Sequence, residues 1–104
     1  METIAFKMQL LPGFELEYQK RHDEIWPELS ALLREAGVQD YYIFLDPTTL
    51  SLFAILHSTN TSKLNTLSEE AIMKKWWKYM ADIMETNPDN SPKQIDLKQV
   101  FYMK

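Results

Sequence analysis

The chain has 104 residues, no cysteine, and 15 acidic against 11 basic side chains, which gives a formal net charge of −4. This length predicts a single domain over residues 1–104, while the missing cysteine excludes disulfides, thiolate metal sites and cysteine nucleophiles and is typical of a reducing cytosol. Without a basic stripe, a long apolar run or a signal peptide at the start, the sequence predicts a cytoplasmic protein that binds neither nucleic acid nor membrane.

Residues 2–10 predict the first strand, because apolar and polar side chains alternate along them. One face carries Ile4, Phe6, Met8 and Leu10. Alternation with a period of two is typical of a strand with one buried face. The Leu-Pro-Gly sequence that follows is expected to end the strand.

A helical spacing of apolar residues runs from Phe14 to Ala36 and is interrupted at Pro27. Proline lacks a backbone N–H and clashes with the preceding turn of a helix, so it is tolerated only in the first turn. We therefore expect two helical segments with a break over residues 23–26. Gly37 is expected to close the second segment.

The second half of the chain predicts a hairpin, a helix and a final strand. Residues 41–45 and 50–57 read as strands joined by the turn Asp-Pro-Thr-Thr. A helix is expected within residues 62–85, in one or two pieces, with an apolar face made by Met73, Trp77, Met80 and Met84. A turn-rich loop follows, and the last strand is expected over residues 94–103.

This order of elements predicts an α+β fold of the ferredoxin-like βαββαβ type, with an antiparallel sheet and both helical segments on one face. The opposite face of the sheet would expose a wide apolar surface to water. A second copy of the chain is the simplest cover for it, so we expect a homodimer.

Tyr18 and His22 are the most informative pair for function. Their spacing of four places the phenol and the imidazole on one helix face. An imidazole titrates near neutral pH, so His22 is a candidate catalytic acid or base. The alternative is a helix face that packs an aromatic ring against a hydrogen-bonded histidine. No cluster has metal-ligand spacing, and two glycines do not make a phosphate loop.

Adjacent aromatic residues predict a binding surface elsewhere. Trp76 and Trp77 point about 100° apart on a helix, so one is expected in the core and the other at a cleft or a subunit contact. Tyr41 and Tyr42 face opposite sides of their strand, and either hydroxyl could meet a ligand. His57 is expected at a strand edge without a partner.

Charged side chains near the end of the helix expected within residues 62–85 give no clear functional signal. Lys78, Asp82 and Glu85 are expected to form a solvated helix face rather than a charge relay.

Several motifs, spread over nearly the whole chain, form a specific combination: Tyr18-x-x-x-His22, Ile25-Trp26-Pro27-Glu28-Leu29, the strand from Tyr41 to Asp46, Trp76-Trp77-Lys78-Tyr79-Met80, the loop Asn87-Pro88-Asp89-Asn90-Ser91-Pro92, and Val100-Phe101-Tyr102. Together they resemble the L-rhamnose mutarotase family. One departure is Leu64, which stands where a tryptophan would be expected. By the resemblance, that segment carries no site residue.

The resemblance implies a cytoplasmic homodimer built as a dimeric α+β barrel, which interconverts the α and β anomers of L-rhamnose without a metal or an organic cofactor. It also implies that His22 is the proton donor. The sugar contacts that it implies are Tyr18, Tyr41, Trp76 and Trp77.

Two other functions fit the same residues. One is a cofactor-free monooxygenase or haem-degrading enzyme on the same dimeric scaffold, because one fold hosts many functions. The other is a dimer that binds a sugar without catalysis.

Overall fold

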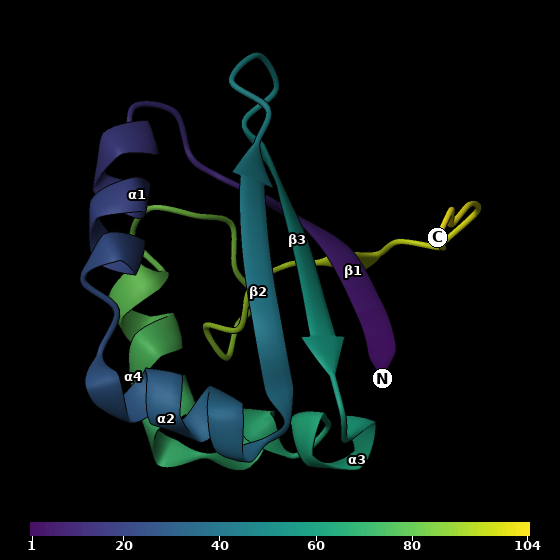
Figure 1. The fold of residues 1–104 in the computed structure, drawn as a ribbon. Coiled ribbons are helices and arrows are strands. Elements are labelled where there is room, and N and C mark those ends of the chain that lie inside the picture. Colours follow the sequence, from purple (N-terminus) through teal and green to yellow (C-terminus); the bar gives the residue numbers. More distant parts are fainter.

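The computed structural model describes residues 1–104, and its centre is a four-stranded sheet in the order β2-β3-β1-β4 (Figure 1). Every neighbouring pair of strands is antiparallel. The strands are β1 (Glu2–Gln9), β2 (Val38–Leu45), β3 (Ser51–Ser58) and β4 (Ile95–Asp96). This is the expected ferredoxin-like α+β arrangement, which confirms the predicted fold class.

The longer helices cover one face of the sheet (Figure 1). They are α1 (Glu15–Asp23), α2 (Pro27–Glu35) and α4 (Ala71–Met80). The predicted break between α1 and α2 is confirmed. Pro27 occupies the first turn of α2, and Trp26 caps that helix in an extended conformation with φ −62° and ψ 132°.

Gly37 ends this helical region, as expected, because it adopts the left-handed conformation with φ 95°. A Cβ atom at Gly37 would lie 2.8 Å from Thr59 Oγ1 and 3.0 Å from the backbone nitrogen of Asn60. Both the backbone angle and the crowding therefore favour glycine at this position.

The predicted alternation in β1 sets which side chains face the helices. Ile4, Phe6 and Met8 pair across the strands with Leu56, Ala54 and Leu52 of β3. Because alternate residues of a strand share a face, these six side chains form the inner face of the sheet. The core lies between that face and the helices, and its most buried large side chains are Leu10, Leu29, Leu52, Met80 and Ile83.

The helix expected within residues 62–85 is divided more than predicted. It comprises α3 (Thr61–Leu64), a short 3₁₀ turn η1 (Leu67–Glu69) and α4. Met80 and Met84 are buried as expected, but Trp76 is more buried than Trp77. Since α4 ends at Met80, Met84 reaches the core through a backbone bridge to Leu10 and not through helical spacing.

The last strand is much shorter than the predicted 94–103. β4 pairs Ile95 and Asp96 with β1, and the Leu97 N–H donates to the Ala5 carbonyl at 2.9 Å. Beyond Leu97 the tail runs away from the helices (Figure 1). A strand needs a neighbour for its backbone hydrogen bonds, and the tail has none within the subunit. Val100 and Phe101 are consequently 88% and 77% exposed.

The outer face of the sheet carries an exposed apolar cluster on β2 and β3, as expected. Tyr42 and Phe44 are 48% and 59% exposed, and their rings stack with centroids 6.3 Å apart. Their cross-strand partners Ile55 and Phe53 are half-buried on the same face. No helix in the structure combines the length and apolar character that crossing a membrane requires.

Candidate active site

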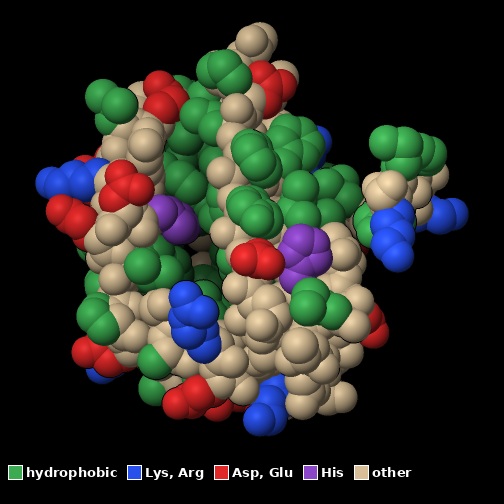
Figure 2. All heavy atoms as spheres, in the orientation of Figure 1, with side chains coloured by type: hydrophobic (Ala, Val, Ile, Leu, Met, Phe, Trp, Pro, Cys, Tyr) green, Lys and Arg blue, Asp and Glu red, His purple; other side chains and the backbone are tan.

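A cavity of about 1440 Å³ lies between the helices and the inner face of the sheet. Figure 2 shows hydrophobic side chains lining a hollow between the helices and β2. Every site residue predicted from the sequence lines this cavity, namely Tyr18, His22, Tyr41, Trp76 and Trp77. They come from three separate elements, α1, β2 and α4.

His22 is anchored through one of its ring nitrogens. Its Nδ1 lies 3.1 Å from the carbonyl oxygen of Tyr18, one helical turn earlier. A carbonyl oxygen can only accept, so Nδ1 carries the proton and Nε2 keeps a lone pair. Burial lowers the pKa of His22 below its ordinary value, against the opposing effects of the Tyr18 hydrogen bond and of Asp23. The ring is therefore neutral at pH 7 with Nε2 free.

Tyr18 lies beside this imidazole, with the two ring centroids 4.3 Å apart. The side chain is buried, and burial together with the nearby Tyr41 raises the pKa of Tyr18 well above its usual value. Its hydroxyl has no hydrogen-bond partner in the chain. Every side-chain polar atom that is fully enclosed in this structure does have a partner, so the Tyr18 hydroxyl is not fully enclosed. The Tyr18 hydroxyl thus opens into the cavity and remains protonated.

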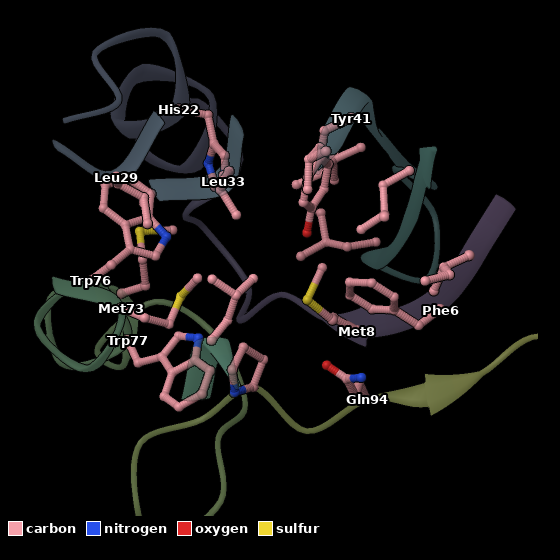
Figure 3. Close-up of a pocket in the computed structure, with 18 of the residues that line it drawn as sticks. Phe6, Met8, His22, Leu29, Leu33, Tyr41, Met73, Trp76, Trp77 and Gln94 are labelled. Atoms are coloured by element: carbon pink, nitrogen blue, oxygen red, sulfur yellow. The ribbon is translucent and has the colours of Figure 1, made fainter. Parts of the chain in front are cut away.

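Tyr41 and Tyr42 are separated as their places on β2 require. Tyr41 lines the cavity and points its hydroxyl into it (Figure 3). Burial of that hydroxyl raises the pKa of Tyr41 to about 12. Tyr42 lies on the outer face of the sheet, where its ring contacts His57. Of the two tyrosines left open by the sequence, only Tyr41 reaches the cavity.

Trp76 and Trp77 both line the cavity, but their surroundings differ. Trp76 is 7% exposed and meets the His22 ring edge-on, with centroids 5.5 Å apart and an interplanar angle of 90°. Trp77 is half-buried. In Figure 3 it lies with Gln94 at the end of the cavity away from His22. Trp76 belongs to the buried core and Trp77 lies at the cleft, as expected, although both also line the cavity.

Apolar side chains that the sequence did not identify as site residues form much of the wall. They include Phe6, Met8, Leu29, Leu33 and Met73 (Figure 3). The period of two in β1 could have placed Phe6 and Met8 on this face. Gln94 also lines the cavity, and no sequence pattern pointed to it.

Two ionisable residues have partners that the sequence did not predict. His57 does have a partner, since its Nδ1 lies 3.6 Å from Asp40 Oδ2 on the outer face. Asp82 is solvated as expected, with its side chain 65% exposed, but it lies beyond the end of α4 and its carboxylate pairs with Arg21 at 2.9 Å. No three histidine, aspartate or glutamate side chains gather closely enough to hold a metal ion.

A model of the L-rhamnose mutarotase family matches residues 3–103. The chain belongs to the L-rhamnose mutarotase family. The resemblance seen in the sequence motifs is therefore confirmed, and it extends over nearly the whole chain.

Individual L-rhamnose mutarotases agree closely with the chain. The one from Agrobacterium fabrum strain C58 is 57% identical over 103 residues, covering 99% of this chain and 96% of the relative. The one from Flavobacterium johnsoniae is 54% identical over 99 residues, covering 95% and 92%. The crystal structure of an L-rhamnose mutarotase from Formosa agariphila matches with a TM-score of 0.94 and 48% identity over 100% of both chains.

More distant structures share the fold of the L-rhamnose mutarotase family without its sequence. A putative antibiotic biosynthesis monooxygenase from Nitrosomonas europaea matches with a TM-score of 0.63 and 11% identity, covering 95% of this chain and 89% of that one. At this identity the match shows the fold alone. Function must therefore be argued from the side chains in the cavity.

Proposed function

We propose that this enzyme interconverts the α and β anomers of L-rhamnose with His22 as its acid–base group. One observation carries the proposal. His22 lines the cavity with Nδ1 bound to the Tyr18 carbonyl and with Nε2 uncommitted, and the same cavity is lined by two protonated tyrosines. Family membership identifies the reaction, and this geometry supports an assignment of roles within it.

Ring opening of a pyranose moves one proton. The anomeric hydroxyl loses its proton as the C1=O1 bond forms, and the C1–O5 bond breaks with its electron pair and a proton going to O5. Both oxygens are bonded to C1, so one imidazole nitrogen can serve both. Nε2 takes the proton from O1 and returns it to O5. A positioned acid–base group of this kind gives about 10²–10⁴-fold acceleration.

The proton donor role of His22 then follows from its starting state. The neutral ring acts first as a base toward the anomeric hydroxyl, and the imidazolium that forms is the donor to the ring oxygen. The aldehyde turns about its C1–C2 bond and closes on the other face by the reverse sequence. No further base is required.

The other cavity residues bind the sugar. The Tyr18 and Tyr41 hydroxyls keep their protons, so each can donate to and accept from sugar hydroxyls. Trp76 and Trp77 offer aromatic surfaces to the C–H groups of the ring and to the methyl group of a 6-deoxysugar. Holding the open chain in this enclosure favours reclosure over escape.

Saturation-transfer NMR on the two anomeric protons of L-rhamnose tests the assignment. The intact enzyme should transfer saturation between the α and β signals, and His22→Ala should reduce the transfer by a factor of about 10² or more. His57→Ala is the matched control, because it removes the other histidine from the far side of the sheet. Undiminished transfer by folded His22→Ala enzyme, or equal losses in both variants, would refute the role of His22.

We further propose that the enzyme is a homodimer. The outer face of the sheet presents Tyr42, Phe44, Phe53 and Ile55, and the apolar residues 100–103 of the tail are exposed. Apolar surface of this kind is unfavourable in water and favours burial against a second copy. The cytoplasmic location implied by the family stays a prediction.

A further inference from the structure

Arg21, the residue before His22, connects α1 to the segment at the end of α4. We call its contacts with Glu17, Tyr79 and Asp82 the Arg21 clamp. Arg21 reaches from α1 to the end of α4, and its Nη1 donates to the Tyr79 carbonyl at 2.7 Å and to Asp82 Oδ1 at 2.9 Å. Its Nε donates to Glu17 Oε2 at 2.7 Å. The Arg21 side chain is only 11% exposed despite its charge.

This clamp is the one polar tie between α1 and the rest of the helical layer. No other side chain of α1 forms a hydrogen bond or an ion pair with another helix or strand. The Tyr79 carbonyl belongs to the last turn of α4, where carbonyl oxygens have no partner within the helix. A guanidinium satisfies that oxygen and also complements the negative end of the helix dipole.

An aromatic chain continues from the clamp into the cavity. The Arg21 Cζ lies 4.4 Å from the centroid of the Tyr79 ring. That ring lies 5.4 Å from the Trp26 ring and 5.7 Å from the Trp76 ring. Trp76 in turn meets His22 edge-on. Arg21 is therefore connected to the imidazole twice, once through the backbone of α1 and once through the rings on α4.

We infer that Arg21 is a positioning residue, which fixes α1 against the end of α4 and so sets how the His22 ring meets Trp76 in the cavity. This inference rests on the proposed function, in which both side chains contact the sugar. Arg21 itself does not line the cavity. It acts through residues that do.

Arginine is suited to this position by its shape. A planar fork can bind a carbonyl oxygen and both oxygens of a carboxylate while its face covers an aromatic ring. A lysine would place a single point charge there and lose the stacking. Substitution by lysine should therefore rescue the clamp only in part.

The first test compares Arg21→Met and Arg21→Lys with Lys20→Met, an exposed neighbour on the same helix that forms no ion pair. Arg21→Met should lower kcat for anomer exchange about 10- to 100-fold with a much smaller change in KM, because small displacements at a reacting centre cost rate. Arg21→Lys should recover part of the loss, and Lys20→Met should match the parent enzyme. An Arg21→Met enzyme with unchanged kcat overturns the inference.

A double substitution separates positioning from general stability. In a His22→Ala background, Arg21→Met should cause no further loss, because the group that it positions is absent. A residue that only stabilises the fold would lower the rate by the same factor in both backgrounds. Equal factors in the two backgrounds would therefore overturn the inference.

The NMR signals of the two histidine rings give a readout that does not depend on activity. The His22 Hε1 signal senses the ring current of Trp76, and the His57 signal serves as an internal reference. Arg21→Met should shift the His22 signal and leave the His57 signal in place. Should that variant fail to fold, Asp82→Asn loosens the same clamp from its exposed end and should shift the His22 signal in the same way.

These outcomes distinguish the two proposals. A fully active His22→Ala enzyme refutes the proposed role of His22, and the ring signals still report whether Arg21 sets the geometry. An inactive His22→Ala enzyme with an unaffected Arg21→Met enzyme refutes only the positioning role. A His22 signal that does not shift in either Arg21→Met or Asp82→Asn also refutes only the positioning role of Arg21.

Discussion

The two histidines of this chain differ in the way that the proposed proton transfer requires. His22 is held at Nδ1 by a backbone carbonyl, is half-buried, and presents a free nitrogen within a cavity. His57 lies on the outer face of the sheet beside Asp40 and Tyr42. Burial keeps the first ring neutral, and its single hydrogen bond decides which nitrogen can react.

With His22 as the proposed acid–base group, its lowered pKa predicts the pH dependence of the enzyme. Burial disfavours the charged ring, so the reactive neutral form persists below pH 6.5, the ordinary pKa of the side chain. The value of kcat/KM should stay level through neutral pH and decline only as the pH falls through the lowered pKa. Polarimetry between about pH 5 and pH 8, with the enzyme-free rate subtracted, measures this profile. Activity that rises as the pH drops below 6.5 would contradict a neutral resting His22.

Among the elements, the broken helix is the one that shapes the site. Pro27 begins α2 and leaves Trp26 extended at the junction. There the Trp26 ring meets Trp76 edge-on, with centroids 5.1 Å apart. In a continuous helix, Trp26 would adopt helical backbone angles, its ring would point in another direction, and this contact would be lost. The break therefore supports the tryptophan that borders His22.

The end of α2 gives a prediction about stability. Gly37→Ala should lower the free energy of unfolding by about 1–3 kcal/mol, because alanine is strained at φ 95° and its Cβ would crowd Thr59 and Asn60. Gly13→Ala is the control, since Gly13 has φ 90° with no atom within 4 Å of the added carbon. Urea unfolding of both variants measures the difference. Equal losses would show that crowding at Gly37 contributes nothing.

Much of the element structure could be predicted because local rules determine it. The alternation of Ile4, Phe6 and Met8 defined a strand, and Pro27 and Gly37 defined where α2 begins and ends. The grouping of Tyr18 with His22 also followed from helical spacing alone.

The rest depended on contacts between distant segments. Trp76, and not Trp77, became the buried tryptophan because α4 turns that side toward Trp26 and His22. Arg21 found its partners on a helix end 58 residues away in sequence. Spacing within a single element carries no information about such pairs. The last strand was predicted too long because its apolar residues lack a neighbour within one subunit.

At the scale of the whole molecule, one face of the sheet is covered by helices and the other is exposed to solvent. The inner face has helices and a cavity. The outer face has exposed aromatic rings on β2, and the tail beyond Leu97 leaves the sheet edge (Figure 1). A single subunit in water would leave this apolar surface unpaired.

The proposed dimer predicts a specific response to charge on the outer face. Phe44→Arg should convert the enzyme into a monomer, because a charge buried between two sheets without a partner is costly. Leu16→Arg is the control, since Leu16 is 85% exposed on α1, within the helical layer on the opposite side. Light scattering coupled to gel filtration at micromolar concentration measures both masses. A monomeric parent enzyme would refute the dimer.

The double restraint on His22 determines which molecule moves during the proposed turnover. Its ring is tied at Nδ1 to the helix backbone and is flanked by the rings of Tyr18 and Trp76. The imidazole therefore does not swing from one oxygen to the other. The part that moves is the sugar, which rotates its own aldehyde group inside the cavity of about 1440 Å³. Stereochemistry at C1 is thus scrambled by the freedom of the substrate around a stationary catalyst.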